Sequence, residues 1–197
     1  MTDLPSKADL RRQVRERLRA TSSEELAAWS QRLIARLQTR DGLWHTAGTV
    51  ALFGGLRNEP DLITDLLPWL RARGWRTVLF AVEGTALHAY EVTGPQDLRR
   101  GPLGVWEPVT DLRHSIPPDE LTLVLVPGLA FSRTDGSRLG RGGGFYDRFL
   151  AQPDLNARLV GICFEAQIFP GIPCEGHDAR VQEVLTETDG QSDGGPR

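Results

Sequence analysis

The stretch Leu-Thr-Leu-Val-Leu-Val-Pro-Gly-Leu-Ala-Phe (121–131), followed by Arg-Leu-Gly-Arg-Gly-Gly-Gly-Phe-Tyr-Asp (138–147), decides the fold. Its first part is a short apolar run of the kind that forms a buried strand. Four of the five residues at 140–144 are glycine, and an apolar spacing typical of a helix begins at Phe145. A strand, a glycine loop and a helix start in this order predict a phosphate site, because glycine lets backbone N–H groups turn toward an anion and the helix offers its positive end.

Other patterns along the chain predict further strands and helices. Ser6 with Asp9, and Ser22 with Glu25, are helix-capping pairs that predict one helix over 6–20 and another beginning at Ser22. The remaining periodic segments predict a helix over 61–73 and strands over 49–53, 76–82, 87–92, 121–126, 158–164 and 181–186.

The alternation of these strands with helices favours a single α/β domain over residues 1–188. We expect a mostly parallel or mixed sheet with helices on both faces, and ligands near the carboxyl ends of its strands. The segment 94–118, rich in glycine and proline, is expected to be mostly loop. Residues 189–197 are polar and glycine-rich, and they are expected to form a disordered tail.

The composition excludes several classes of protein. Hydrophobic residues make up 40% and charged residues 25% of the 197 positions, which is typical of a soluble protein with one full core. The net charge of -3 disfavours nucleic-acid binding, which usually needs a basic surface. No signal sequence or membrane-length apolar run is present, so we expect a cytoplasmic protein without a membrane partner. Cys163 and Cys174 show neither metal-binding nor disulfide spacing.

Lys7 is the only lysine of the chain. Lys7, Arg11 and Arg15 recur every four residues on the predicted first helix, where like charges repel by a few tenths of a kcal/mol. An anionic partner would relieve this repulsion. The spacing alone favours a solvated basic face, and contact with an anionic partner stays open as the alternative.

Two general phosphate motifs do not fit the glycine loop. The P-loop motif needs lysine and a hydroxyl residue after its last glycine, where this chain has Phe145-Tyr146-Asp147. The dinucleotide fingerprint needs its glycines directly after a strand, whereas eleven residues, 127–137, lie between Val126 and Arg138.

A narrower pattern accounts for the whole loop and for several distant motifs. These motifs are Lys7-x-x-Leu-Arg11, Glu59 shortly after the 49–53 run, Trp106-Glu-Pro108, Pro127-Gly-Leu-Ala-Phe131 with Gly136-x-Arg-Leu-Gly-x-Gly-Gly-Gly-Phe-Tyr-Asp-Arg148, and Phe164-Glu-Ala-Gln167 with Pro173 and His177-Asp178. In this order and across nearly the whole chain, they resemble the 5-formyltetrahydrofolate cyclo-ligase family, also called methenyltetrahydrofolate synthetases. The tripeptide 106–108 is similar to the Glu-Pro turn of that family.

The sequence departs from the family pattern in two places. Ser132 stands where the family usually has aspartate, and the loop that follows is one residue longer. Either Asp135 in this loop replaces the missing acid, or the position has no acid. The segment 81–83 ends in glutamate where a Leu-Pro ending is common in the family, which affects a wall of the expected folate pocket.

The resemblance implies an enzyme with a three-layer α/β/α fold, similar to the NagB/RpiA/CoA-transferase-like fold. It implies that MgATP drives the conversion of 5-formyltetrahydrofolate, with or without a polyglutamate tail, to 5,10-methenyltetrahydrofolate. The γ-phosphoryl group goes to the formyl oxygen, N10 closes the ring and phosphate departs. A monomer or a weak homodimer is expected.

The resemblance also implies roles for individual residues. The expected catalytic residues are Lys7, Arg11, Arg138 and Tyr146. The expected ATP-binding residues are Lys7, Ala8, Asp9, Leu10 and Arg11 together with Arg138, Leu139, Gly140, Arg141, Gly142, Gly143, Gly144, Phe145 and Tyr146. The expected folate-binding residues are Phe53, Gly54, Glu59, Trp106 and Tyr146, and Asp147 and Asp178 are expected to bind Mg²⁺.

Less specific interpretations of some of these residues remain. Glu59 also fits an acid that stabilises a helix N-terminus, and Asp147 also fits a helix cap. Trp106 and Phe145 also fit packing residues, and His177 is expected to support structure rather than catalysis.

Two further functions stay open beside the enzyme. A relative that binds nucleotide or folate without turnover is one, and Ser132 is the feature that favours it. An enzyme of the same fold acting on a sugar phosphate or a CoA ester is the other, but neither substrate requires the Lys7 motif or Glu59.

Overall fold

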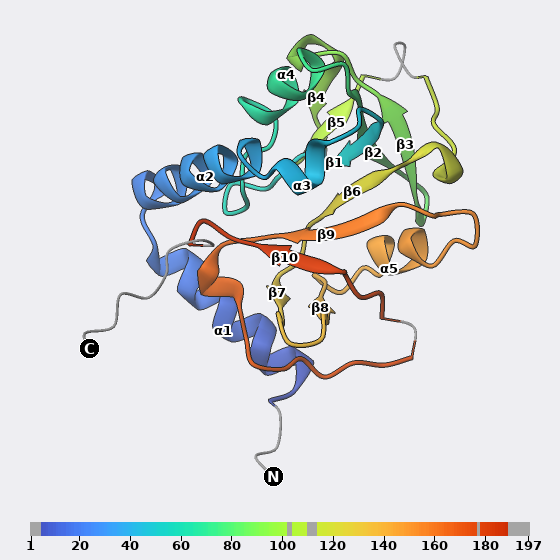
Figure 1. Ribbon diagram of the computed structural model, residues 1–197. Coiled ribbons are helices and arrows are strands. Elements are labelled where there is room, and N and C mark those ends of the chain that lie inside the picture. Colours follow the sequence, from blue (N-terminus) through green and yellow to red (C-terminus); the bar gives the residue numbers. More distant parts are fainter. Residues whose placement is uncertain (1–4, 102–103, 110–113, 177, 189–197) are drawn as a thin grey trace.

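The computed structural model describes residues 5–101, 104–109, 114–176 and 178–188. At its centre lies a six-stranded sheet in the order β10-β9-β6-β1-β2-β3 (Figure 1). Its strands are β1 (Thr49–Leu52), β2 (Arg76–Glu83), β3 (Ala86–Glu91), β6 (Leu123–Val126), β9 (Arg158–Ile162) and β10 (Glu183–Leu185). All neighbours run parallel except β3, which is antiparallel to β2. The predicted α/β class with a mixed, mostly parallel sheet is confirmed.

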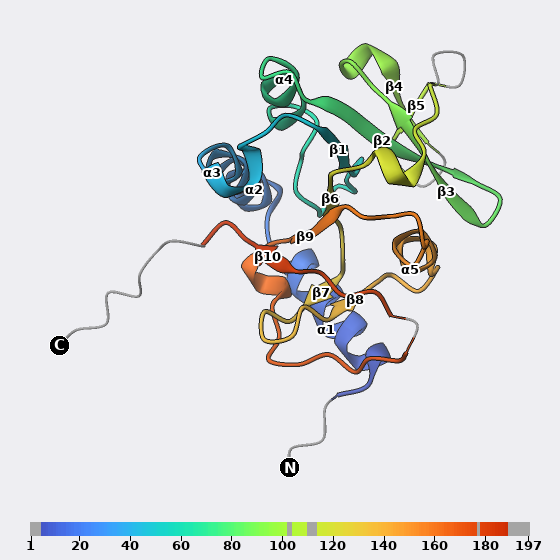
Figure 2. The same cartoon turned by 45° about the vertical axis from the view of Figure 1, so that its right-hand side comes forward.

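Helices cover both faces of this sheet (Figure 2). The helices α2 (Ser23–Gln38), α3 (Asp41–Trp44) and α4 (Leu66–Arg71) lie on one face, and α5 (Phe145–Leu150) lies on the other. Successive residues of a strand point to opposite faces, and β1 follows this rule. Val50 and Leu52 join the core under α2, whereas Ala51 joins the core that contains Phe149 of α5.

The first helix, α1 (Lys7–Ala20), packs away from the main sheet against a small hairpin, β7 (Ala130–Phe131) with β8 (Arg138–Leu139). Its buried residues are Leu10, Val14 and Leu18, as the apolar spacing predicts. They share a core cluster with Ala130 and Leu139 of the hairpin, so α1 is placed directly beside the glycine loop that follows β8.

The capping signals in the sequence form as predicted. The Ser6 side chain accepts a hydrogen bond from the Asp9 backbone N–H at the start of α1. At the start of α2, the Ser22 and Glu25 side chains each accept from the other's backbone N–H, which is a complete capping box. These caps fix where both helices begin.

The predicted helix over 61–73 is much shorter in the structure, where α4 spans only Leu66–Arg71. Asp61 explains the difference, because its carboxylate accepts hydrogen bonds from the backbone N–H groups of Ile63 and Thr64 and forms a local turn. Gly74 ends the segment with a positive φ of 80°, a conformation that favours glycine.

The segment 94–118 is more ordered than the sequence indicates. A second small hairpin, β4 (Leu98–Arg100) with β5 (Trp106–Pro108), lies between the short 3₁₀ helices η1 (Pro95–Asp97) and η3 (Pro118–Glu120). The residues 106–108 therefore form a strand rather than the turn that the family resemblance implies. The short β4 sequence, Leu-Arg-Arg, lacks the apolar alternation that identifies a strand.

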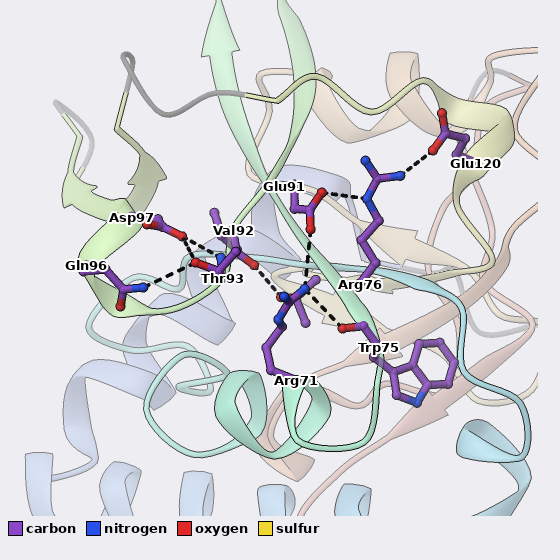
Figure 3. Close-up of polar contacts among 10 residues, drawn as sticks. Arg71, Trp75, Arg76, Glu91, Val92, Thr93, Gln96, Asp97 and Glu120 are labelled. Atoms are coloured by element: carbon purple, nitrogen blue, oxygen red, sulfur yellow. Dashed lines mark hydrogen bonds and ion pairs between the residues drawn. The ribbon is translucent and has the colours of Figure 1, made fainter.

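Charged side chains tie β2 to β3 and to η3 (Figure 3). Arg76 at the start of β2 donates to Glu91 of β3 at 2.8 Å and to Glu120 of η3 at 2.5 Å. Arg71 at the end of α4 also reaches Glu91, at 3.5 Å. These contacts hold the one antiparallel strand in place and so support the wall that β2 and β3 give to the cavity described below.

Some expectations concern residues outside the described ranges. They include the role of His177 and the disordered tail at 189–197. Within the described ranges, no helix combines the length and apolar character that crossing a membrane requires.

Candidate active site

The site lies where the order of the sheet reverses. β1 and β6 are parallel neighbours, but the chain continues from β1 toward β2 and from β6 toward β9, on opposite sides. The segments that follow these strands therefore separate and leave a crevice at their carboxyl ends. Phe53 and Gly54 come from the β1 end, and Pro127 and Gly128 come from the β6 end.

A cavity of 330 Å³ occupies this crevice, and we call it the apolar cavity. Its apolar wall is formed by Phe53, Leu56, Phe80, Val82, Leu87, Val105, Trp106, Phe145 and Tyr146. Aromatic rings on several sides suit a flat, ring-shaped ligand. All the residues expected to bind folate line this cavity: Phe53, Gly54, Glu59, Trp106 and Tyr146.

Trp106 reaches the cavity because the hairpin that carries it is docked on the end of β1. The Trp106 backbone N–H donates to the Gly54 carbonyl at 3.1 Å. A Cβ at Gly54 would lie 2.0 Å from the Trp106 carbonyl oxygen, so this approach requires glycine. The Arg100 guanidinium lies 4.2 Å from the Trp106 ring centre and donates to the Gly104 carbonyl, which holds the indole in place.

Glu59 is held in a defined orientation at the cavity wall. One of its oxygens, Oε1, accepts hydrogen bonds from Arg141 Nε at 3.0 Å and Nη2 at 2.6 Å. The other, Oε2, accepts from the Leu56 backbone N–H at 2.9 Å. Glu59 therefore bonds to the glycine loop and does not cap a helix, because the predicted helix begins only at Leu66.

A second cavity, of 450 Å³, lies on the other side of the glycine loop, and we call it the charged cavity. Its lining includes Lys7, Arg11, Arg138, Asp147, Glu175 and Asp178. The basic residues of α1 thus reach the site from the first helix, and the acids come from α5 and from the segment before β10. This concentration of charge around an open space is suited to a phosphate-bearing ligand.

Lys7 and Asp178 meet inside this cavity. Lys7 Nζ donates to Asp178 Oδ2 at 2.7 Å and to Glu175 Oε1 at 2.9 Å. The hydrogen bond with Asp178 raises the pKa of Lys7 above its usual value, so the ammonium stays charged. Arg11 lies one turn later and donates from Nε to the Gly140 carbonyl at 3.1 Å. Arg15 is exposed and does not line the cavity, so only the first two residues of the basic row of α1 reach it.

The two cavities share a wall made of Arg138, Asp147, Gly140 and Gly144. Arg138 is only 4% exposed, and its Nη2 donates to Asp147 Oδ1 at 2.5 Å. Its Nε is a buried donor without a partner among the residues described. Buried donors are normally satisfied, so this nitrogen is available to an acceptor that enters the site.

The glycine loop offers backbone donors to the same place. Within the described part of the chain, the backbone N–H groups at 140–144 donate no hydrogen bonds. Gly142 and Gly144 have positive φ values of 111° and 65°, which turn successive peptide groups in ways that other residues resist. The N–H groups of the predicted anion cradle therefore have no partner within the described protein, and the cradle itself stays a prediction. The short α5, six residues long, adds little as a helix dipole.

Several predicted ATP-binding residues lie elsewhere. Leu10 is buried in the core under α1, Asp9 bonds to Ser6 and Arg12, and Ala8 is exposed; none of them lines the charged cavity. Leu139, Gly140, Gly142 and Gly144 do line it. Arg141, Gly143, Phe145 and Tyr146 instead line the apolar cavity.

Tyr146 belongs to the apolar wall rather than to the phosphate side. Its ring lies 5.6 Å from that of Phe80 in an edge-to-face arrangement. Desolvation raises the pKa of the Tyr146 phenol above its usual value, so its hydroxyl stays protonated and serves as a hydrogen-bond donor near neutral pH.

The sequence analysis assigns no role to two acids that line the cavities, Glu107 and Glu175. Glu107 is itself part of the 106–108 motif, and Glu175 lies three residues before Asp178. Their burial and their neighbours depend on how distant segments pack, which a single sequence does not specify.

The two residues expected to bind Mg²⁺ are carboxylates of the charged cavity. Asp147 and Asp178 both line the charged cavity, but each is paired with a cation, Arg138 and Lys7 respectively. No group of three or more His, Cys, Asp or Glu side chains suited to a metal occurs among the residues that the structure describes. Two carboxylates alone do fit Mg²⁺ when phosphate oxygens and waters supply the other ligands.

The fold and the site together define a class of protein. It has an α/β sheet whose reversal point carries an apolar cavity beside a charged one, with a glycine loop between them. The protein-family model described as the 5-formyltetrahydrofolate cyclo-ligase family matches residues 3–187. The chain therefore belongs to the 5-formyltetrahydrofolate cyclo-ligase family, as the sequence motifs predict.

Individual relatives agree with this assignment. The chain is 30% identical to a 5-formyltetrahydrofolate cyclo-ligase of Mycolicibacterium smegmatis over 181 residues, which cover 89% of this chain and 87% of that protein. It is 28% identical to the 5-formyltetrahydrofolate cyclo-ligase of Mus musculus over 198 residues, covering 92% and 94% of the two chains.

Solved structures agree as well. The 5,10-methenyltetrahydrofolate synthetase of Aquifex aeolicus matches with a TM-score of 0.77 and 29% identity, covering 93% of this chain and 90% of that one. The synthetase of Mycoplasma pneumoniae has the same fold, with a TM-score of 0.76 at 21% identity over 93% and 99% of the two chains. The finer likeness to the NagB/RpiA/CoA-transferase-like fold stays a prediction.

Proposed function

We propose that this chain converts 5-formyltetrahydrofolate to 5,10-methenyltetrahydrofolate and consumes ATP in the reaction. Family membership supports the reaction, and one observation on this chain carries it: the apolar and charged cavities share the Arg138–Asp147 wall. A folate ring in one cavity and a triphosphate in the other would bring the formyl oxygen close to the γ-phosphorus.

Each cavity suits one of the two substrates. The aromatic wall of the apolar cavity would hold the pterin ring, and Glu59, which lines the same cavity, would contact the folate. In the charged cavity, the free N–H groups of Gly140, Gly142 and Gly144 would contact the triphosphate. Lys7 supplies a compact charge and Arg11 a planar fork, both of which suit phosphate oxygens.

The chemistry needs positioning and charge neutralisation rather than a covalent nucleophile. The formyl oxygen attacks the γ-phosphorus, the bond to ADP breaks, and an iminium-like phosphate forms. N10 then attacks the formyl carbon and loses its proton, and the carbon–oxygen bond breaks to release phosphate. Arg138 lies at the shared wall with an unpartnered Nε, so it would neutralise charge that develops on the transferred group.

The proposal includes Mg²⁺, with Asp147 and Asp178 as the residues that would hold it. When bound, the ion would neutralise phosphate charge. The Lys7–Asp178 and Arg138–Asp147 pairs keep these four side chains in place until a ligand competes for them. The substrate's polyglutamate tail, a monomeric or weakly dimeric state and a cytoplasmic location belong to the same proposal.

A relative that binds without turnover is less well supported. Ser132, the feature that favours it, is fully buried at the β7–β8 hairpin, and its hydroxyl faces the Pro170 carbonyl at 3.4 Å. It lines neither cavity. Asp135 accepts hydrogen bonds from Ser137 in the same hairpin, which makes it a turn residue. The departure from the family pattern is therefore remote from the proposed chemistry.

A turnover assay tests the proposed function. Purified protein is mixed with MgATP and (6S)-5-formyltetrahydrofolate, and the near-ultraviolet band of methenyltetrahydrofolate is followed. We expect product that depends on ATP. Measurable binding of both substrates without any product would contradict the enzyme and favour the binding protein.

A further inference from the structure

Three carboxylates line the apolar cavity, Glu59, Glu107 and Asp147, and they differ in how their oxygens are used. Asp147 is held by its ion pair at the wall shared with the charged cavity. Both Glu59 oxygens already accept hydrogen bonds, from Arg141 and from the Leu56 N–H. Glu107 is only 7% exposed, yet its side chain forms no hydrogen bond or ion pair with any residue that the structure describes. Glu107 is therefore the one carboxylate of this cavity with no partner on either oxygen among the described residues.

The β4–β5 hairpin is built to leave room for this carboxylate. Glu107 lies on β5 directly after Trp106, and both residues line the cavity. The Gly101 N–H donates to the Val105 carbonyl at 2.8 Å and closes the hairpin. A Cβ at Gly101 would lie 2.2 Å from Glu107 Cδ and within 2.5 Å of both carboxylate oxygens. The missing side chain at Gly101 is what allows the carboxylate to lie there.

Without a protein partner, the Glu107 carboxylate depends on the water that still reaches its oxygens. A ligand that displaces this water must supply hydrogen bonds in its place. A ligand that presents two neighbouring N–H donors would restore those hydrogen bonds. In a reduced folate, the 2-amino group and the adjacent ring N–H form such a pair on one edge of the pterin. Its flat ring would at the same time contact the aromatic walls of the cavity.

We propose that Glu107 accepts hydrogen bonds from the 2-amino edge of the pterin and so determines which ring the apolar cavity selects. This assignment rests on the proposed function, since it takes a reduced folate as the ligand. It gives the two acids separate tasks. Glu59 is held by Arg141 at the glycine loop, and Glu107 remains available to the substrate.

The first test replaces the carboxylate by an amide of the same shape. For Glu107→Gln we expect the Kd of 5-formyltetrahydrofolate, measured by calorimetry without ATP, to rise at least tenfold, while the Kd of ATP stays unchanged. The midpoint of thermal unfolding should not fall, because no protein partner is lost. Glu24→Gln, an exposed glutamate at the start of α2, is the matched control and should change none of these values.

The second test removes the donor from the ligand. The wild type should bind 5-formyltetrahydrofolate at least tenfold more tightly than its 2-desamino analogue, and Glu107→Gln should lose that preference. Gly101→Ala, which displaces the carboxylate without altering its chemistry, should also weaken folate binding. A Glu107→Gln protein that keeps the wild-type preference, or that unfolds at a lower temperature with unchanged folate affinity, would overturn the proposal. Failure of the wild type itself to bind folate would instead refute the function on which the proposal rests.

Discussion

Lys7 Nζ and Asp178 Oδ2 lie 2.7 Å apart, although the two residues come from opposite ends of the chain. Their contact closes the charged cavity between α1 and the segment before β10. The two side chains belong to the groups expected to contact phosphate and Mg²⁺, respectively. A bound nucleotide would therefore meet a cation and an anion that already lie in position.

Lys7→Ala should abolish most of the activity. Loss of one charged phosphate contact typically reduces the rate by about 10²–10³, and ATP-dependent formation of methenyltetrahydrofolate should fall by this amount. Arg15→Ala is the control, since Arg15 follows the same row on α1 but is exposed outside the cavity. Equal loss in both variants would mean that the row acts through general charge and not through this cavity.

Gly54→Ala should damage the apolar cavity. The new Cβ would lie 2.0 Å from the Trp106 carbonyl oxygen, so β5 must move away from β1 and carry the Trp106 wall with it. We expect at least a tenfold higher KM for 5-formyltetrahydrofolate and a lower midpoint of thermal unfolding. Gly42→Ala, where a Cβ meets nothing within 4 Å, should leave both unchanged. An unaltered KM in Gly54→Ala would show that the docked hairpin does not shape the folate site.

Arg141→Met should weaken the binding of folate and leave the binding of ATP nearly unchanged. Arg141 holds Glu59 by two hydrogen bonds and lines the apolar cavity, so we expect about a tenfold rise in the Kd of folate. The Kd of ATP should change little. A larger effect on ATP than on folate would instead place Arg141 with the phosphate-binding residues, as the sequence motif predicts.

Glu165 should make stability depend on pH in the acid range. Hydrogen bonds from Arg133 lower the pKa of Glu165 to about 2, against an ordinary value of 4.5. The stabilisation is therefore complete above pH 4.5 and is lost as the pH falls from 4.5 toward 2. Glu165→Gln should be less stable than the wild type at pH 6, and the difference in unfolding free energy should shrink across that window. A constant difference from pH 6 to pH 2 would contradict the assignment.

The sequence predicts most of the central sheet because its strands are apolar runs bounded by glycine or polar residues. It also predicts α1 and α2, since Ser6 and Ser22 provide explicit caps. It does not predict the hairpin of β4 and β5, whose pairing depends on contacts with β1 and not on local apolar alternation. The early end of the predicted 61–73 helix has a similar cause, because the Asp61 side chain competes for backbone N–H groups.

The sequence predicts those site residues that belong to a motif and whose side-chain type already indicates their chemistry. Lys7, Arg11, Arg138 and Asp147 all reach the charged cavity. The place of Arg141 is not predictable in this way. Arg141 lines the apolar cavity, whereas the next residue, Gly142, has a positive φ and lines the charged cavity. The spacing of the motif does not show which cavity a loop residue faces. Glu107 was overlooked because its burial arises only when the hairpin packs on the sheet.

The central claim is that the formyl oxygen receives the γ-phosphoryl group. The most direct measurement uses 5-formyltetrahydrofolate labelled with oxygen-18 in the formyl group, turned over by the protein with MgATP, and mass spectrometry of the phosphate released. The account predicts that each phosphate carries one labelled oxygen. Phosphate without the label, formed together with methenyltetrahydrofolate, would show that the oxygen leaves by another route and would contradict the mechanism.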